Sequence, residues 1–329
     1  MGYSLNLTLC LAALSLTHGV YGQDAKDLEV ANACMAEAVK TAMPEQTVGE
    51  LREQCSPAEK TAFGKRFALE QQASANPFAI LPHKPNYVLP VTYSESNFAP
   101  YDGVLQGIEF DDVEAKFQVS LKYVAVENFF FHDLDVQFAF TATSWWQSYN
   151  SAISAPFRET NYEPELIFNY HNPWSLFGIP VGNTYLSLNH QSNGQSGALS
   201  RSWNRLIGGI AFNVGDVAWG IRSWYRFPES EKTELGSPRG DDNPDIEKYL
   251  GYGELGALWQ VTAGHNLEIM LRNNLRSDNK GAIQLGWSFP LSKHLRGYIE
   301  YFNGYGESLI YYDHAIERLG IGVKLTDWL

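Results

Sequence analysis

The chain has 329 residues, of which 24 are basic and 37 acidic, and 14% of its residues are aromatic. The formal net charge of −13 argues against a nucleic-acid partner, because contacts to phosphates need clustered positive charge. No segment after the N-terminus is long and apolar enough for a membrane-spanning helix, which needs about 20 residues. The aromatic fraction is high for a soluble domain and is typical of membrane barrels with aromatic girdles at both interfaces.

The N-terminus has the pattern of a secretory signal. Its apolar core covers Leu5–Leu16, and Val20-Tyr21-Gly22 supplies small residues at the outer and inner cleavage positions. We therefore expect residues 1–22 to be removed when the protein is exported.

Residues 23–77 differ in composition from the rest of the chain. They are rich in Ala, Glu, Lys and Gln, and their apolar spacing predicts a small helical extension in the periplasm. In an exported chain Cys34 and Cys55 most simply form one disulfide, with two buried thiols as the alternative. The prolines between residues 77 and 85 indicate a linker to the next domain.

From residue 86 onward, apolar and polar residues alternate with the period of β-strands. Segments with this pattern lie near 87–93, 113–124, 134–147, 161–170, 185–192, 202–213, 217–227, 247–261, 266–274, 280–289, 295–303 and 316–328. A soluble β-sandwich would also alternate. The many full charges on the polar side and the alternating final strand favour a membrane barrel instead. We predict an all-β protein, with a 12-stranded antiparallel transmembrane β-barrel over residues 78–329.

An even number of strands places both chain ends on the periplasmic side of the membrane. The turns at 213–216 and 262–266 are then short and periplasmic, while the loops at 228–246 and 304–314 are long and face outward. The loop at 193–201 also falls on the outer side.

A serine, a histidine and an asparagine share one face of two of these strands. Leu188, His190 and Ser192 point the same way because alternate residues of a strand share a face. If the next strand forms a hairpin with this one, Asn204 faces His190. A serine needs a base to take its proton, and the base needs a third group to hold its tautomer. We predict Ser192 as the nucleophile, His190 as the general base and Asn204 as the orienting group; the alternative is a set of interfacial polar residues without chemistry.

These residues carry a family resemblance. The run His190-Gln191-Ser192-Asn193-Gly194, continued by Ser200-Arg201-Ser202-Trp203-Asn204-Arg205-Leu206, closely resembles the signature of bacterial outer membrane phospholipase A. The likeness extends to the motifs at 144–147, 156–164, 241–246 and 304–309, and it covers residues 86–329. It implies a twelve-stranded barrel in the outer membrane of a Gram-negative bacterium that hydrolyses sn-1 and sn-2 acyl esters of phospholipids and lysophospholipids. It also implies that the enzyme requires calcium and is active as a homodimer.

By the same resemblance, His190, Ser192 and Asn204 match the family's catalytic residues one for one. Gly194 matches the residue whose backbone amide helps to stabilise the oxyanion. These assignments agree with the roles predicted from strand parity.

The resemblance also implies calcium ligands. Ser200 matches a ligand that acts through its hydroxyl, Gln195 one that acts through its carbonyl oxygen, and Ser154 a carbonyl ligand from the partner subunit. Asp242 matches a carboxylate ligand of a further calcium site, which a single subunit forms without its partner. Gly197 stands where the family has another aspartate ligand of that further site. Calcium prefers such oxygen ligands.

Two further departures from the family concern the metal loop and the dimer. The family often has Arg where Gln195 stands, which a carbonyl ligand tolerates. Ala142 replaces a polar glutamine that the family associates with the dimer interface. Two rival functions remain open at this point: another outer-leaflet serine esterase, such as a lipid A deacylase, and a non-catalytic barrel or pore.

Overall fold

The computed structural model describes residues 36–37, 39–40, 70, 73, 76, 78–95, 99–101, 104–105, 107–130, 134–170, 174–232, 237, 240–262, 264–292 and 295–326. The chain divides into two compact units, residues 1–60 and 61–329, and every described strand belongs to the second unit. The predicted signal segment and the predicted Cys34–Cys55 disulfide lie outside the described residues. In the predicted extension, residues 36–37 and 39–40 are helical. No helix in the described part of the chain has the length and apolarity needed to cross a membrane.

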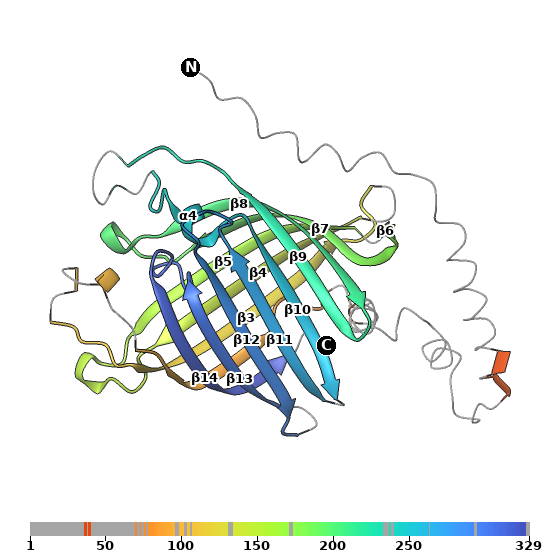
Figure 1. Ribbon diagram of the computed structural model, residues 1–329, viewed down its shortest axis with the longest axis horizontal. Helices are drawn as coiled ribbons and strands as arrows, with labels where there is room; N and C mark the ends of the chain where they lie inside the picture. The colour runs from red at the N-terminus through yellow and green to blue at the C-terminus, as the bar shows by residue number, and fades with distance from the viewer. Residues whose placement is uncertain are drawn as a thin grey trace, which may run out of the picture. The chain divides into compact units, whose positions relative to one another are not determined.

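Twelve of the described strands form a barrel (Figure 1). They are β2 (Asn86–Tyr93), β3 (Val113–Val126), β4 (Leu134–Trp146), β5 (Phe157–Tyr170), β7 (Ile179–Ser192), β8 (Ser202–Val214), β9 (Val217–Arg226), β10 (Gly253–Thr262), β11 (His265–Asn273), β12 (Gly281–Pro290), β13 (Arg296–Tyr305) and β14 (Ala315–Thr326). Two short strands, β1 (Leu81–Pro82) and β6 (Trp174–Leu176), pair with β3 and β7 respectively.

The first and last barrel strands close the sheet. On one side β2 pairs with β14, where Val91 lies opposite Ile321, and on the other it pairs with β3, where Val88 lies opposite Phe117. All pairings between neighbouring barrel strands are antiparallel. The predicted all-β, twelve-stranded antiparallel barrel is therefore confirmed.

Each predicted segment corresponds to one barrel strand, but some boundaries differ. Strands β5 and β7 begin at Phe157 and Ile179, where the sequence predicted starts near 161 and 185. The predicted strand start at 247 is wrong, because Ile246–Leu250 form the helix α4. Both ends of this single turn are buried, and Gly251 follows with a φ of 64°, a backbone conformation that ends the turn.

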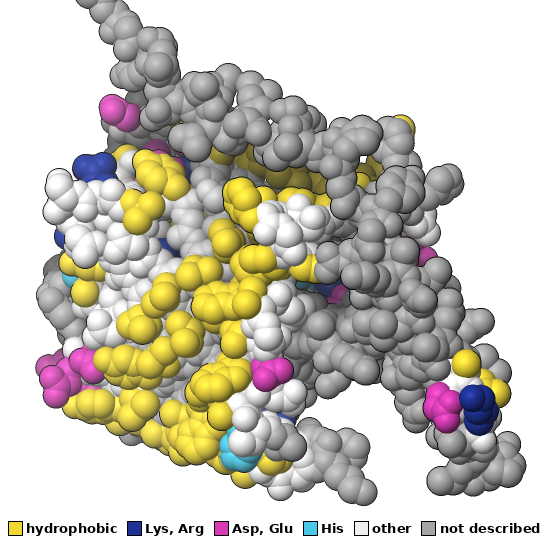
Figure 2. Space-filling view, turned by 45° about the vertical axis from the view of Figure 1, so that its right-hand side comes forward, with side chains coloured by type: hydrophobic (Ala, Val, Ile, Leu, Met, Phe, Trp, Pro, Cys, Tyr) yellow, Lys and Arg dark blue, Asp and Glu magenta, His cyan; other side chains and the backbone are white. Residues whose placement is uncertain are grey.

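The two faces of the barrel have reversed polarity compared with a soluble sheet protein. On β7, Ser187 and Asn189 are buried, whereas Leu186 and Leu188 are 45% and 43% exposed. Figure 2 shows a broad band of hydrophobic side chains across one outer face, with acidic side chains at its margins. A soluble sandwich would bury its apolar face instead, so the exposed apolar band indicates a barrel that is solvated by lipid.

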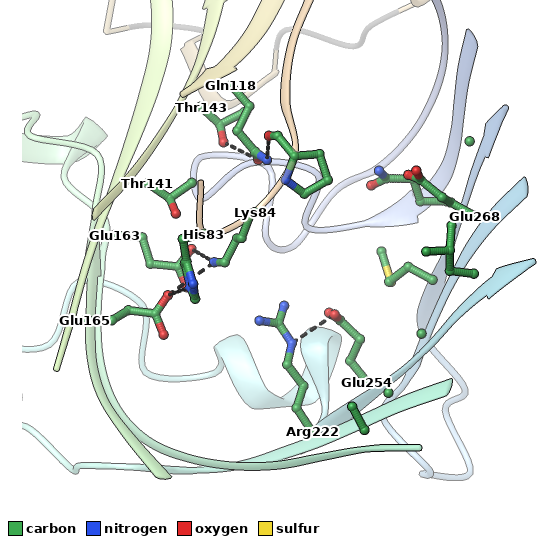
Figure 3. A pocket seen from close by; sticks show the side chains of 18 of the residues that line it. His83, Lys84, Gln118, Thr141, Thr143, Glu163, Glu165, Arg222, Glu254 and Glu268 are labelled. Atoms are coloured by element: carbon green, nitrogen blue, oxygen red, sulfur yellow. Dashed lines mark hydrogen bonds and ion pairs between the residues drawn. The ribbon is translucent and has the colours of Figure 1, made fainter. Parts of the chain in front are cut away.

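The lumen contains charged side chains that pair with one another. A cavity of about 520 Å³ lies among them. In this cavity Lys84 Nζ lies 2.6 Å from Glu163 Oε2, and Arg222 Nε lies 2.9 Å from Glu254 Oε1 (Figure 3). His83, from the segment that precedes β2, contacts Glu165 at 3.1 Å.

One end of the barrel carries the long loops, among them the loop at 193–201 and the loop at 306–314; we call it the long-loop end. There Leu309, Ile310 and Tyr311 are at most 3% exposed, so the loop at 306–314 packs inward. Backbone amides of Leu309 and Ile310 donate hydrogen bonds to Asn161 and Glu159 of β5. This inward packing argues against the rival reading of an open pore.

Candidate active site

The hairpin of β7 and β8 brings the predicted catalytic residues together. His190 lies directly opposite Asn204 in the antiparallel register, and Ser192 lies opposite Ser202. Leu188 pairs with Leu206 on the same outward face. The structure therefore has the register that the sequence predicted, and it places these polar groups on the lipid-facing side beside exposed leucines.

A hydrogen bond joins the predicted base to its orienting group. The His190 Nδ1 and Asn204 Oδ1 atoms are 2.8 Å apart. The amide nitrogen of Asn204, Nδ2, donates to Glu229 Oε1 at 3.0 Å. Because a carboxylate only accepts, the amide NH₂ faces Glu229 and the amide oxygen faces the ring. The Nδ1 atom of His190 must then carry the proton, which leaves Nε2 as the basic nitrogen.

Ser192 lies two residues from His190 on the same outward face. Among the described residues no hydrogen bond joins its hydroxyl to the imidazole. Catalytic hydrogen bonds are often long or misaligned in enzymes without substrate, so this spacing is compatible with transfer of the serine proton to Nε2.

A row of outward-facing residues runs across four strands at the level of Ser192. Ala142 of β4 pairs with Tyr162 of β5, which pairs with Ser192, which in turn pairs with Ser202 of β8. Leu188 and Tyr162 are 43% and 40% exposed. The serine is thus bordered by surface that acyl chains can cover.

Gly194 has a backbone that requires glycine. Its φ is 65°, and a Cβ atom at this position would lie 3.2 Å from the Tyr162 ring. Gly194 comes two residues after Ser192, in the loop at the long-loop end of the barrel. The sequence predicted that its backbone amide stabilises an oxyanion. The positive φ and the close aromatic ring together make substitution costly.

Asn193 fixes the loop that follows β7. Its side chain, 3% exposed, donates from Nδ2 to the Leu199 carbonyl at 2.8 Å and accepts at Oδ1 from the Arg201 amide at 2.9 Å. The Gln195 amide donates to the same Oδ1 at 3.3 Å. The loop that carries Gly194, Gln195 and Ser200 is therefore held by a buried amide.

Two of the predicted calcium ligands are in contact. The Ser200 hydroxyl donates to Asp242 Oδ2 at 2.8 Å, and the Ser202 hydroxyl donates to the same oxygen at 3.4 Å. Lys232 Nζ forms an ion pair with Asp242 Oδ1. The Asp242 carboxylate therefore already pairs with one positive charge, and the Ser200 hydroxyl lies within hydrogen-bond distance of its other oxygen. Gln195 lies on the same loop as Ser200, and an added Cβ at Gly197 would meet nothing within 4 Å.

Ser154 lies in a different loop, between β4 and β5. Its φ is 62° and that of Ala155 is 48°, so two successive residues other than glycine adopt the left-handed conformation. The Ala155 amide donates to the Asn150 carbonyl, which closes this turn at 2.9 Å. Among the described residues no hydrogen bond joins Ser154 to the 193–201 loop.

Sequence reasoning missed Glu229 and Lys232. Both lie in the long loop after β9, where the sequence showed only a run of charged and polar residues. Strand parity was the available signal for Glu229, because Tyr225, Phe227 and Glu229 continue the outward positions of β9. No local pattern marks Lys232 as the partner of Asp242.

Comparisons with known proteins show the family of this chain. The family model "Phospholipase A1" matches residues 63–325. Phospholipase A1 from Klebsiella pneumoniae is 34% identical over 304 residues, which cover 91% of this chain and 99% of the relative. Phospholipase A1 from Escherichia coli K12 is 35% identical over 263 residues, covering 78% of this chain and 84% of that protein.

Solved structures of outer membrane phospholipases also match this chain. The outer membrane phospholipase A from Escherichia coli superposes with a TM-score of 0.70 at 33% identity, over 77% of this chain and 94% of that chain. A dimer of the Salmonella typhi outer membrane phospholipase with bound calcium matches with the same TM-score, identity and coverage.

A closed barrel with an apolar outer surface, matched by the phospholipase A1 family model and by solved outer membrane phospholipases, is a membrane-embedded lipid hydrolase. The fold and the matches place it in the outer membrane of a Gram-negative bacterium. The chain belongs to the phospholipase A1 family, and it is a phospholipase.

Proposed function

We propose that this phospholipase hydrolyses the sn-1 and sn-2 acyl esters of phospholipids and lysophospholipids at the outer leaflet, with a Ser192–His190–Asn204 triad. The proposal rests chiefly on one observation, the 2.8 Å contact between His190 Nδ1 and Asn204 Oδ1 on the lipid-facing side. The exposed leucines beside the triad support a substrate that approaches through the bilayer.

In the proposed reaction Ser192 Oγ attacks the ester carbonyl carbon while its proton passes to His190 Nε2. The Asn204 oxygen holds the ring and stabilises the imidazolium that forms. The Gly194 amide donates a hydrogen bond to the developing oxyanion, a contact that is strongest in the transition state. The imidazolium then protonates the departing lysophospholipid oxygen, and water releases the fatty acid from Ser192 by the same steps in reverse.

Calcium is the proposed cofactor. The Ser200 hydroxyl and the Gln195 carbonyl would hold the ion whose positive charge would stabilise the oxyanion, and Asp242 would contribute to the further site of the monomer. Support comes from the contact between Ser200 and Asp242 and from the calcium in the Salmonella typhi relative.

A homodimer is the proposed active form, since the Salmonella typhi relative is a dimer. In this arrangement the Ser154 carbonyl of one subunit would complete the calcium site of the other. Ala142 faces outward on β4 in the same row as Tyr162 and Ser192, so this row is the proposed contact between barrels.

For the remaining chain we propose a signal peptide at residues 1–22 and a helical periplasmic extension over 23–77 with a Cys34–Cys55 disulfide. Mass spectrometry of the mature protein tests both points. A mature N-terminus other than Gln23, or two free thiols, would contradict them.

Fatty-acid release from phospholipid micelles, measured on refolded protein with calcium or with excess chelator, tests the proposed function. We expect release with calcium, and none with chelator or with Ser192→Ala. Ser223→Ala is the matched control, because Ser223 is another outward-facing serine, on β9. Release by Ser192→Ala at the wild-type rate would exclude the proposed nucleophile, and full release in chelator would exclude the metal.

A further inference from the structure

We infer that Glu229 is a positioning residue of the active site, whose carboxylate acts on His190 through the Asn204 amide. The triad thereby becomes a four-membered relay, Ser192–His190–Asn204–Glu229. This inference rests on the proposed function, because it extends the proposed triad by one residue.

The chain after β9 brings Glu229 to this position. Strand β9 ends at Arg226, but the Phe227 amide still donates to the Asn204 carbonyl at 2.9 Å, so the pairing with β8 continues by one residue. Glu229 follows two residues later on the same outward side. Its Oε1 accepts the Asn204 Nδ2 hydrogen bond at 3.0 Å, and the contact is partly buried.

The physical need for Glu229 comes from the chemistry of an amide. An asparagine side chain can rotate by half a turn, which exchanges its oxygen and its NH₂ group. With the NH₂ group toward His190, Nδ1 would have to accept, and the proton would move to Nε2. That tautomer cannot accept a proton from Ser192. A carboxylate accepts only, so Glu229 holds the NH₂ group on its own side and keeps the amide oxygen on the ring.

Glu229 also supplies a charge that the triad itself lacks. The imidazolium formed during the reaction is stabilised by a negative charge one amide away. A carboxylate directly at position 204 would lie on a lipid-facing strand, where an ionised group is costly. Glu229 lies in the loop beyond the end of β9, so the negative charge stays at the membrane boundary while the neutral amide of Asn204 enters the strand region.

The first test needs no activity. In detergent, the side-chain NH₂ signal of Asn204 is recorded by ¹H–¹⁵N NMR and assigned through its loss in Asn204→Ala. We expect Glu229→Ala to shift this signal, because its hydrogen-bond acceptor is removed. Glu231→Ala is the matched control, a glutamate in the same loop that is exposed, and it should leave the signal in place. An unshifted signal in Glu229→Ala would overturn the inference.

The second test separates positioning from substrate binding. We expect Glu229→Ala to lower kcat about tenfold with KM nearly unchanged, the size expected for a lost hydrogen bond to a charged group. Glu229→Gln, which can still accept but has no charge, should lose less. In the Asn204→Ala background Glu229→Ala should have no further effect, because the relay is already broken.

Equal losses with and without Asn204, or a loss confined to KM, would overturn the relay. Failure of the proposed function has a different signature: Ser192→Ala would then keep its activity, while the NMR signal of Asn204 would still report whether Glu229 holds the amide. Heat-modifiable migration in gels confirms that each variant is folded.

Discussion

Inside the barrel many polar groups are charged and paired, whereas the outward polar groups of the β7–β8 hairpin include a serine, an imidazole and an amide. Lys116, 3% exposed, lies 2.7 Å from Glu300 and 3.0 Å from Glu307 in the lumen. On the outside, an amide and an imidazole are joined, and the amide donates to the carboxylate of Glu229, which follows the end of β9. Full charges thus lie in the lumen, where oppositely charged partners surround them. Neutral dipoles lie on the lipid-facing strands, where an ionised group would be costly.

The charged side chains in the lumen and the polar side chains on the lipid-facing side therefore have different roles. Removing a lumen charge should cost stability, because its buried partner remains ionised without compensation. Removing an outward polar group should cost activity instead, because lipid and detergent solvate the apolar surface that replaces it.

His190→Ala should lower kcat by about 10⁴-fold without loss of folding, since a triad serine without its base is a weak nucleophile. Ester hydrolysis and heat-modifiable migration measure the two effects. His265→Ala is the control, because His265 begins β11 and stacks on Trp287 away from the β7–β8 hairpin. An unfolded His190→Ala protein would contradict the idea that outward polar groups contribute to activity and not to stability.

Lys116→Met should lower the free energy of unfolding by about 3–5 kcal/mol, because Glu300 and Glu307 lose their shared buried partner. Urea unfolding in lipid vesicles measures this change, and kcat of the folded fraction should stay near the wild-type value. Lys248→Met is the matched control: its pair with Asp245 is exposed and 3.8 Å long, so the change should be below about 0.5 kcal/mol.

Gly194→Ala and Gly197→Ala form a matched pair, because both residues have a φ of 65°. Each should lose about 1–2 kcal/mol of stability from the left-handed conformation. Only Gly194→Ala should also lose activity, since its Cβ would press on Tyr162 beside Ser192. Equal activities of the two variants would argue against a role of Gly194 in the reaction.

Lys232→Gln should raise the affinity for calcium about threefold, the smallest effect of the series, because a partly exposed ammonium that competes for Asp242 is removed. Calorimetric calcium titration of the Ser192→Ala protein measures binding without turnover. Lys280→Gln, in a different loop, serves as control. An unchanged affinity would show that Lys232 does not compete with the ion.

Much of the site could be predicted from the sequence because strand geometry is periodic. Alternation placed Leu188, His190 and Ser192 on one face, and a hairpin around the 193–201 loop set His190 opposite Asn204, as the register confirms. The alternating pattern could not indicate the helical turn at Ile246–Leu250, because the apolar residues of this segment are spaced in a way that also suits the start of a strand. The helix exists because its apolar ends pack into a cluster with Trp203 and Trp224.

The sequence by itself determined the strand count, the inward and outward faces and the register of the β7–β8 hairpin, because a period of two residues carries this information locally. Only the tertiary structure decided which side chains meet: Glu229 on Asn204, Lys232 on Asp242, and Lys116 between Glu300 and Glu307. Lys116 and Glu300 come from strands far apart in the chain, which closure of the barrel brings together. The other two contacts depend on the path of the loop after β9, and a period of two residues encodes neither that path nor the closure.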